Sequence, residues 1–187
     1  MIVTDSWIFV HNPKAGGASV EKALGEPLKS GHLHSPLSAI QKGDREAFGF
    51  IRNPWDRMLS LYAYQCQKPQ PPKSPAYQQL IRDNGFKWWL MEDEYFIEGW
   101  TPGLEPIQRR SQMWWLEGCD FIGRFENIDD DFLWACHAFG MVTGSLPHIN
   151  KSEHAHYSTY YRDESRAHVA EHFAPEIEQF GYQFEEG

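Results

Sequence analysis

The feature that most limits the fold is a turn rich in lysine and glycine, which follows an apolar segment near the start of the chain. Residues 7–11 read Trp-Ile-Phe-Val-His and predict a strand, and residues 17–25 predict a helix. The turn between them carries Lys14, Gly16 and Gly17. A strand, a glycine turn and a helix in this order direct several backbone N–H groups and a positive helix end at an anion. The stretch therefore predicts an anion cradle, with Lys14 at its mouth.

The spacing of this turn differs from that of the Walker motif, the loop that binds nucleoside triphosphates. In the Walker motif a glycine, four residues and a second glycine precede the lysine, which a serine or threonine follows. Here Lys14 precedes Gly16 and Gly17, and Ala15 stands directly after the lysine. We therefore expect the turn to bind a phosphate-type group without being an ATP loop.

A second candidate anion site lies in residues 48–62, which read Phe-Gly-Phe-Ile-Arg-Asn-Pro-Trp-Asp-Arg-Met-Leu-Ser-Leu-Tyr. Asn53 is a favoured N-cap, so a helix is expected to begin directly after a strand that ends at Arg52. Arginine can bind a phosphate through two parallel hydrogen bonds, and the Ser60 hydroxyl adds a donor. The alternative is that Arg57, on the same helix face as Ser60, pairs with a surface carboxylate while Ser60 only packs. Two such sites predict a ligand with two separated phosphate-type groups.

The order of the predicted elements indicates an α/β fold. The sequence predicts strands at 7–11, 47–52 and 121–124, and helices at 17–25, 54–66, 106–117, 128–140 and 163–180. Strands that alternate with helices favour βαβ units and a mainly parallel sheet. A segment with four prolines begins at Lys68 and opens a Pro/Trp-rich insertion over about 68–105. A chain of this length is expected to form one domain over residues 1–187.

Composition and charge exclude several classes of function. The formal net charge is −9, whereas a broad nucleic-acid surface needs a basic face. The sequence contains no stretch of about eighteen apolar residues and no signal-peptide pattern. The three cysteines are far apart and form no CxxC pair, which favours free thiols in a reducing compartment. We therefore expect a cytoplasmic protein without membrane insertion or nucleic-acid partners, whose anionic ligand binds in a local basic pocket.

The two loop motifs together resemble those of the sulfotransferase superfamily, and most closely its carbohydrate-type and bacterial branch. Loops of that branch run like His-x-Pro-Lys-x-Gly-Gly-x-Ser and Arg-Asn-Pro-x-x-Arg-x-x-Ser, and this chain matches them at 11–19 and 52–60. Further likeness occurs at 123–127, 148–152 and 177–182. The resemblance implies a P-loop-like, three-layer α/β fold, with a central and mainly parallel sheet flanked by helices. It also implies binding of 3′-phosphoadenosine 5′-phosphosulfate (PAPS) as the sulfuryl donor, with no metal.

The resemblance also implies which residues bind PAPS. By this likeness the 5′-phosphosulfate is held by the first loop, at Lys14, Gly16, Gly17, Ala18 and Ser19. The 3′-phosphate is held by Arg52 and Ser60, and Lys151 and Ser152 close over the nucleotide. The chain departs from the family pattern at Ala15 and Ala18, where relatives often carry threonine. The departure at Ala18 removes one hydroxyl donor and leaves its backbone N–H.

The acceptor hydroxyl has to lose a proton, so the reaction needs a general base. Histidine titrates closest to neutrality, and residues 31–35 read Gly-His-Leu-His-Ser. We expect the base to be His34, with His32 as the alternative; a loop in which neither histidine has a chemical role is the other reading. His11 is expected to be structural. Lys14 is the candidate to neutralise charge on the oxygen that leaves with the 5′-phosphate.

Three hypotheses for the function follow. The first is a PAPS-dependent sulfotransferase acting on a hydroxyl acceptor, with a carbohydrate as the class that the branch likeness favours. The second is a P-loop-like nucleotide kinase, which Ala15 after the lysine and the strand end at Arg52 both disfavour. The third is a nucleotide-binding module without catalytic activity, which the two alanines favour and which Lys14, Arg52 and Ser60 oppose.

Overall fold

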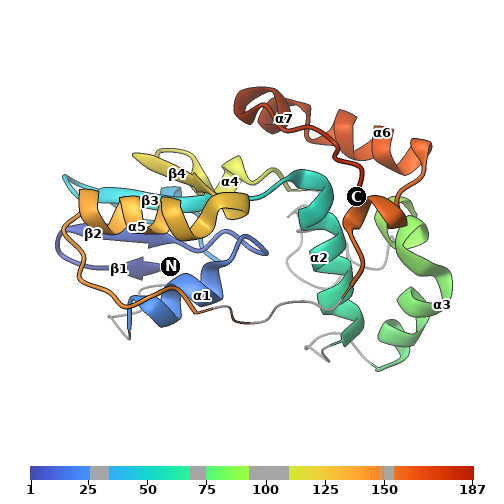
Figure 1. The fold of residues 1–187 in the computed structure, drawn as a ribbon, viewed down its shortest axis with the longest axis horizontal. Coiled ribbons are helices and arrows are strands. Elements are labelled where there is room, and N and C mark those ends of the chain that lie inside the picture. Colours follow the sequence, from blue (N-terminus) through green and yellow to red (C-terminus); the bar gives the residue numbers. More distant parts are fainter. Residues whose placement is uncertain (26–33, 68–74, 93–109, 148, 150–153) are drawn as a thin grey trace. The chain divides into compact units, whose positions relative to one another are not determined.

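The computed structural model describes residues 1–25, 34–67, 75–92, 110–147, 149 and 154–187. The chain divides into two compact units, shown as a ribbon in Figure 1. The first unit comprises Met1–Arg52 and Ser111–Lys151, and the second comprises Asn53–Arg110 and Ser152–Gly187. The chain thus passes between the units three times. The single-domain organisation stays a prediction.

A four-stranded sheet forms the centre of the first unit. Its strands lie in the order β1 (Ile2–Val3), β2 (Trp7–Val10), β3 (Glu46–Ile51) and β4 (Phe121–Arg124). β2, β3 and β4 pair in parallel, and β1 pairs with β2 in the antiparallel sense. The three parallel strands are those that the sequence predicts. The antiparallel strand was not predicted, because two residues are too few to show a period.

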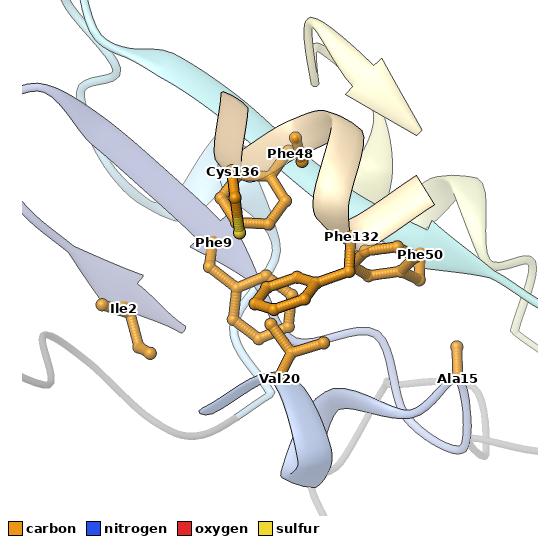
Figure 2. Packing of buried hydrophobic residues seen from close by; sticks show 9 residues of the cluster. Ile2, Phe9, Ala15, Val20, Phe48, Phe50, Phe132 and Cys136 are labelled. Carbon is orange, nitrogen blue, oxygen red and sulfur yellow. The ribbon is translucent and has the colours of Figure 1, made fainter. Parts of the chain in front are cut away.

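Aromatic residues from alternate strand positions form the core on one face of the sheet. Phe9 is paired in register with Phe48, and Phe50 lies two residues further along β3, so their side chains share a face. Helices α1 (Gly17–Ala23) and α5 (Ile128–Ala138) cover this face. Figure 2 shows Val20 of α1 and Phe132 of α5 packed against these rings. The turn that follows β2 therefore starts from a buried strand end.

The opposite face of the sheet is covered by the short helix α4 (Met113–Leu116). Gly49 of β3 provides the space, because a Cβ atom there would lie 2.5 Å from Leu116 Cδ2. A short 3₁₀ turn, η1 (Leu37–Ala39), packs beside α4. Helices thus lie on both faces of the sheet, and the prediction of an α/β fold with a mainly parallel central sheet is confirmed.

The second unit is helical in the residues that the structure describes. It contains α2 (Pro54–Gln67), α3 (Pro75–Met91), the 3₁₀ turn η4 (Tyr157–Tyr160), α6 (Asp163–His172) and α7 (Ala174–Phe180). The Tyr161 hydroxyl donates to the Trp55 carbonyl at 2.8 Å, and Trp55 Nε1 donates to the Arg166 carbonyl at 3.1 Å. These contacts join α2 to the C-terminal part of the chain.

Some predicted element boundaries were wrong. The helix predicted over 163–180 is two helices, because Pro175 has no N–H to continue the hydrogen-bond ladder of α6. The predicted helix at 106–117 is observed only from Met113, and residues 106–109 lie outside the described residues. Part of the expected insertion is the helix α3, which was not predicted. Within the described ranges, every helix is either too short or too polar to cross a membrane.

Candidate functional site

The turn between β2 and α1 has a backbone conformation that few residue types adopt. Gly16 directly precedes α1 and has a φ of 79°, in the left-handed region that favours glycine. Lys14 also has a positive φ, of 68°. That region is rare for a residue with a side chain. The turn therefore fixes its lysine in a defined and unusual conformation.

Close neighbours leave little space for a side chain at either glycine of the turn, and at Gly16 the positive φ adds to this preference. A Cβ atom on Gly16 would overlap Ile128 at the start of α5, and one on Gly17 would overlap the ring of His11. The first N–H groups of a helix have no partner one turn earlier within it; in α1 the Ser19 N–H donates instead to the Gly16 carbonyl at 2.9 Å. Because no side chains at 16 and 17 shield those groups, the turn has the form of an anion cradle.

Ser19 lies in the first turn of α1 and is buried. Its Oγ accepts a hydrogen bond from the Ile149 N–H at 3.1 Å. The hydroxyl oxygen that accepts this bond still carries a hydrogen of its own to donate. Ser19 thus contacts the backbone of Ile149. Lys151 and Ser152, the residues expected to close over the nucleotide, lie outside the described residues, as does His32.

The structure brings Arg52 and Lys14 together. Arg52 directly follows β3, and its Nη1 donates to the Lys14 carbonyl at 3.0 Å. The guanidinium carbon lies 4.1 Å from the centre of the Phe125 ring. The Arg52 backbone is held by Gln112, whose Oε1 accepts from the Arg52 N–H at 3.0 Å and whose Nε2 donates to the Arg52 carbonyl at 2.8 Å. Two residues that are predicted to bind the anion therefore contact each other, through the Arg52 side chain and the Lys14 backbone.

Ser60 and Arg57 lie on the buried side of α2 in the second unit. Their exposed fractions are 3% and 1%. Arg57 Nη1 donates to the Arg110 carbonyl at 3.2 Å, so Arg57 is not the surface residue that the alternative interpretation required. Asn53 caps α2 as expected, since its Oδ1 accepts from the Trp55 N–H at 3.1 Å. A 3′-phosphate site formed by Arg52 and Ser60 stays a prediction.

His34 is held by backbone contacts close to the turn. Its Nδ1 lies 3.3 Å from the His11 carbonyl, and its own carbonyl accepts from Trp115 Nε1 at 3.1 Å. Because a carbonyl can only accept, Nδ1 carries the proton and Nε2 keeps its lone pair. Burial of the ring, and next the neighbouring His11, lower the pKa of His34 from 6.5 to about 4. The imidazole is therefore neutral at neutral pH.

His11 connects this base candidate to the glycine turn. Its ring packs edge-on against His34, with ring centres 4.6 Å apart, and fills the space beside Gly17. His11 Nδ1 lies 2.9 Å from Glu21 Oε1. The contact with Glu21 fits the structural role expected for His11, and it also fixes the orientation of the ring.

Sequence reasoning missed Gln112 and Asn12 as parts of this site. Asn12 Nδ2 donates to the Phe50 carbonyl at 2.8 Å and to Gln112 Oε1 at 2.9 Å, which ties the ends of β2 and β3 together. Both side chains are buried. A buried amide next to a strand end is a weak signal in a sequence, because its partners lie up to 100 residues away.

Within the described residues, no group of three or more His, Cys, Asp or Glu side chains is arranged to hold a metal ion. The site instead offers two cationic side chains, at Lys14 and Arg52, and a neutral imidazole at His34. Such a set can bind an anion, stabilise negative charge that grows on it, and accept a proton.

Comparison with known proteins identifies the family. A model of the sulfotransferase family matches residues 19–183, well over half of the chain. The match begins at Ser19, so the lysine and glycines of the turn directly precede it. A search of curated proteins found no match. On the basis of the family match, the chain belongs to the sulfotransferase family.

Proposed function

We propose that the chain transfers the sulfuryl group of PAPS to a hydroxyl acceptor, with carbohydrates as the first acceptor class to test. Family membership supports sulfuryl transfer in general. One observation supports PAPS as the donor above all: Arg52 contacts the backbone of Lys14. This contact lies beside two glycines whose surroundings leave little space for a side chain. Bound PAPS supplies an activated sulfuryl group on a 5′-phosphate, together with a second phosphate at the 3′ position.

Lys14 is proposed to neutralise the negative charge that grows on the bridging oxygen as the sulfuryl group leaves. Positioned charge carries most of the catalysis in such group transfers, because little covalent chemistry is left for the protein. The backbone N–H groups of Gly16, Gly17 and Ala18 and the Ser19 hydroxyl are proposed to hold the 5′-phosphosulfate. The Cβ overlap at both glycines supports this, since a cradle needs close approach of the backbone.

Arg52 and Ser60 are proposed to bind the 3′-phosphate, and Lys151 and Ser152 to contact the nucleotide. Asn53 caps α2 directly after Arg52, so the arginine lies at the junction of strand and helix, where the motif places it. ATP carries no 3′-phosphate, so a 3′-phosphate site would favour the binding of PAPS over that of ATP. For the competing kinase hypothesis, Ala15 after the lysine remains unfavourable.

His34 is proposed as the general base, acting through Nε2, and His32 remains the alternative. The Nδ1 contact with the His11 carbonyl supports the tautomer that leaves Nε2 as the acceptor. Burial keeps the ring neutral, so no prior deprotonation is needed at neutral pH. A weak base suffices, because the acceptor hydroxyl becomes strongly acidic once its oxygen bonds to sulfur.

The test is transfer of labelled sulfate from PAPS to a panel of carbohydrate and small hydroxyl acceptors. Lys14→Ala is expected to lower transfer by roughly 100-fold or more, because a preorganised positive charge is lost. Lys22→Ala, an exposed lysine on α1, is the matched control and should transfer at the wild-type rate. Normal turnover by Lys14→Ala would refute the role of the lysine.

A further inference from the structure

The backbone of Lys14 needs support from its surroundings. Among the described residues, Lys14 is the one non-glycine residue with a positive φ, of 68°. Backbone strain of this kind persists only where the surrounding structure holds it in place. The contacts of the turn should therefore show which residues hold it.

Arg52 contacts the strained position directly. Its Nη1 donates to the Lys14 carbonyl at 3.0 Å. The guanidinium plane is fixed by Phe125, with the guanidinium carbon 4.1 Å from the ring centre. Only 9% of Arg52 is exposed, so the side chain has little freedom to move away from the turn. A planar, stacked arginine is a more rigid anchor than a lysine would be.

Gln112 fixes the backbone from which Arg52 extends. Its amide pairs with both the N–H and the carbonyl of Arg52, at 3.0 and 2.8 Å, as a neighbouring strand would. Gln112 has no exposed surface, and its Oε1 also accepts from Asn12 Nδ2 at 2.9 Å. Asn12 lies two residues before the lysine. The same amide therefore anchors both the arginine and the start of the turn.

We propose that Arg52, held by Gln112, is a positioning residue for Lys14 and acts on the chemical step as well as on nucleotide binding. This inference rests on the proposed function, in which Lys14 stabilises the leaving oxygen. Without the arginine, the turn can relax to an ordinary φ, and the lysine ammonium leaves the position from which it acts. Displacements of about 1 Å in such groups can cost 100-fold in rate.

The two possible roles of Arg52 differ in the kinetic parameter that they change. A residue that only binds the 3′-phosphate changes donor affinity and leaves kcat at saturating PAPS unaltered. A residue that positions Lys14 lowers kcat, because the affected interaction is made with the reacting atoms. Gln112 helps to distinguish these two roles of Arg52. Its amide contacts Arg52 and Asn12, but it has no positive charge that could bind a phosphate.

The experiment measures kcat at saturating PAPS and the dissociation constant of 3′-phosphoadenosine 5′-phosphate (PAP) in two variants. Arg52→Lys keeps the charge and loses the stacked fork, and Gln112→Met keeps the volume and loses the amide. Gln112→Met is expected to lower kcat about tenfold or more while PAP affinity changes less than about threefold. Arg52→Lys is expected to lower kcat to a similar extent and to weaken PAP binding as well, because the bidentate fork to the 3′-phosphate is lost.

Two matched controls account for general effects of each substitution. Arg166→Lys replaces an arginine that also stacks on a phenylalanine, with the guanidinium carbon 4.4 Å from the Phe184 ring centre. Gln65→Met replaces a buried glutamine that accepts from Trp89 Nε1 at 2.9 Å. Both controls should keep the wild-type kcat, even where the melting temperature falls.

The outcomes separate the two proposals. A wild-type kcat in both Arg52→Lys and Gln112→Met, with PAP affinity lost only in the arginine variant, would overturn the positioning role and leave the sulfotransferase proposal intact. A wild-type protein that neither binds PAP nor transfers sulfate would overturn both. A lower kcat in Gln65→Met as well would also count against the positioning role, since loss of any buried amide would then suffice.

Discussion

At the scale of single residues, the surroundings of His34 decide what chemistry it can do. Its Nδ1 proton is committed to the His11 carbonyl, and the ring packs edge-on against His11, which Glu21 orients. Burial and the neighbouring His11 lower the pKa of His34 to about 4, and the Glu21 carboxylate opposes this shift. The imidazole therefore stays neutral across the physiological range, which is the form that the proposed base requires.

This lowered pKa predicts a pH dependence of stability. Between about pH 4 and 6.5 the unfolded chain binds a proton at His34 that the folded chain excludes, so the free energy of unfolding rises with pH. The contribution of His34 to stability is complete above pH 6.5. As the pH falls, this contribution is lost, and the free energy of unfolding decreases by up to about 3 kcal/mol. Urea unfolding measures the difference in the free energy of unfolding between pH 5 and pH 7.5. This difference should be smaller for His34→Gln than for the wild type. An unchanged difference would contradict this account of the ring.

Substitution of the base tests the same residue by activity. His34→Ala should lose turnover and retain PAP binding, because the proposed base acts on the acceptor hydroxyl. If His32→Ala shows that behaviour instead and His34→Ala remains active, the base is His32. Labelled-sulfate transfer and calorimetric PAP titration on the two variants measure these outcomes.

At the scale of elements, the junction between β3 and α2 was predictable because its signals are local. The strand end predicted at Arg52 and the cap predicted at Asn53 depend on neighbouring residues. The structure has the cap at Asn53, and it ends the strand one residue earlier than predicted, at Ile51. Gln112 was not predictable in this way, because it meets Arg52 across 60 residues of chain. The α3 helix was missed for another reason. The prolines before it predict a loop, and the residues that follow were therefore assigned to an insertion.

The cap itself carries a stability prediction. Asn53→Ala removes the acceptor for the Trp55 N–H and the donor to the Gln183 carbonyl, both in a buried position. We expect a loss of about 2–3 kcal/mol in the free energy of unfolding. Asn84→Ala, which removes an exposed side-chain bond to the Leu80 carbonyl, should change stability by less than about 0.5 kcal/mol. Equal losses in denaturant unfolding of the two variants would show that the cap contributes nothing specific.

At the scale of the whole molecule, the chain crosses between two compact units three times. A chain that returns repeatedly cannot complete either unit from one continuous segment. We therefore expect the predicted single domain to unfold in one cooperative transition, which scanning calorimetry measures. Two resolved transitions, with one unit still folded after the first of them, would show that the units are independent domains.

Calorimetric titration of the wild-type protein with three nucleotides tests whether this family member takes PAPS as its donor. The nucleotides are PAP, 5′-AMP, which lacks the 3′-phosphate, and ATP with Mg²⁺. We expect PAP to bind about tenfold or more tightly than 5′-AMP, since charged hydrogen bonds to the 3′-phosphate are lost in 5′-AMP. We also expect no comparable binding of ATP with Mg²⁺. Equal binding of PAP and 5′-AMP, or binding of ATP with Mg²⁺ in preference to PAP, would contradict the proposal of PAPS as the donor.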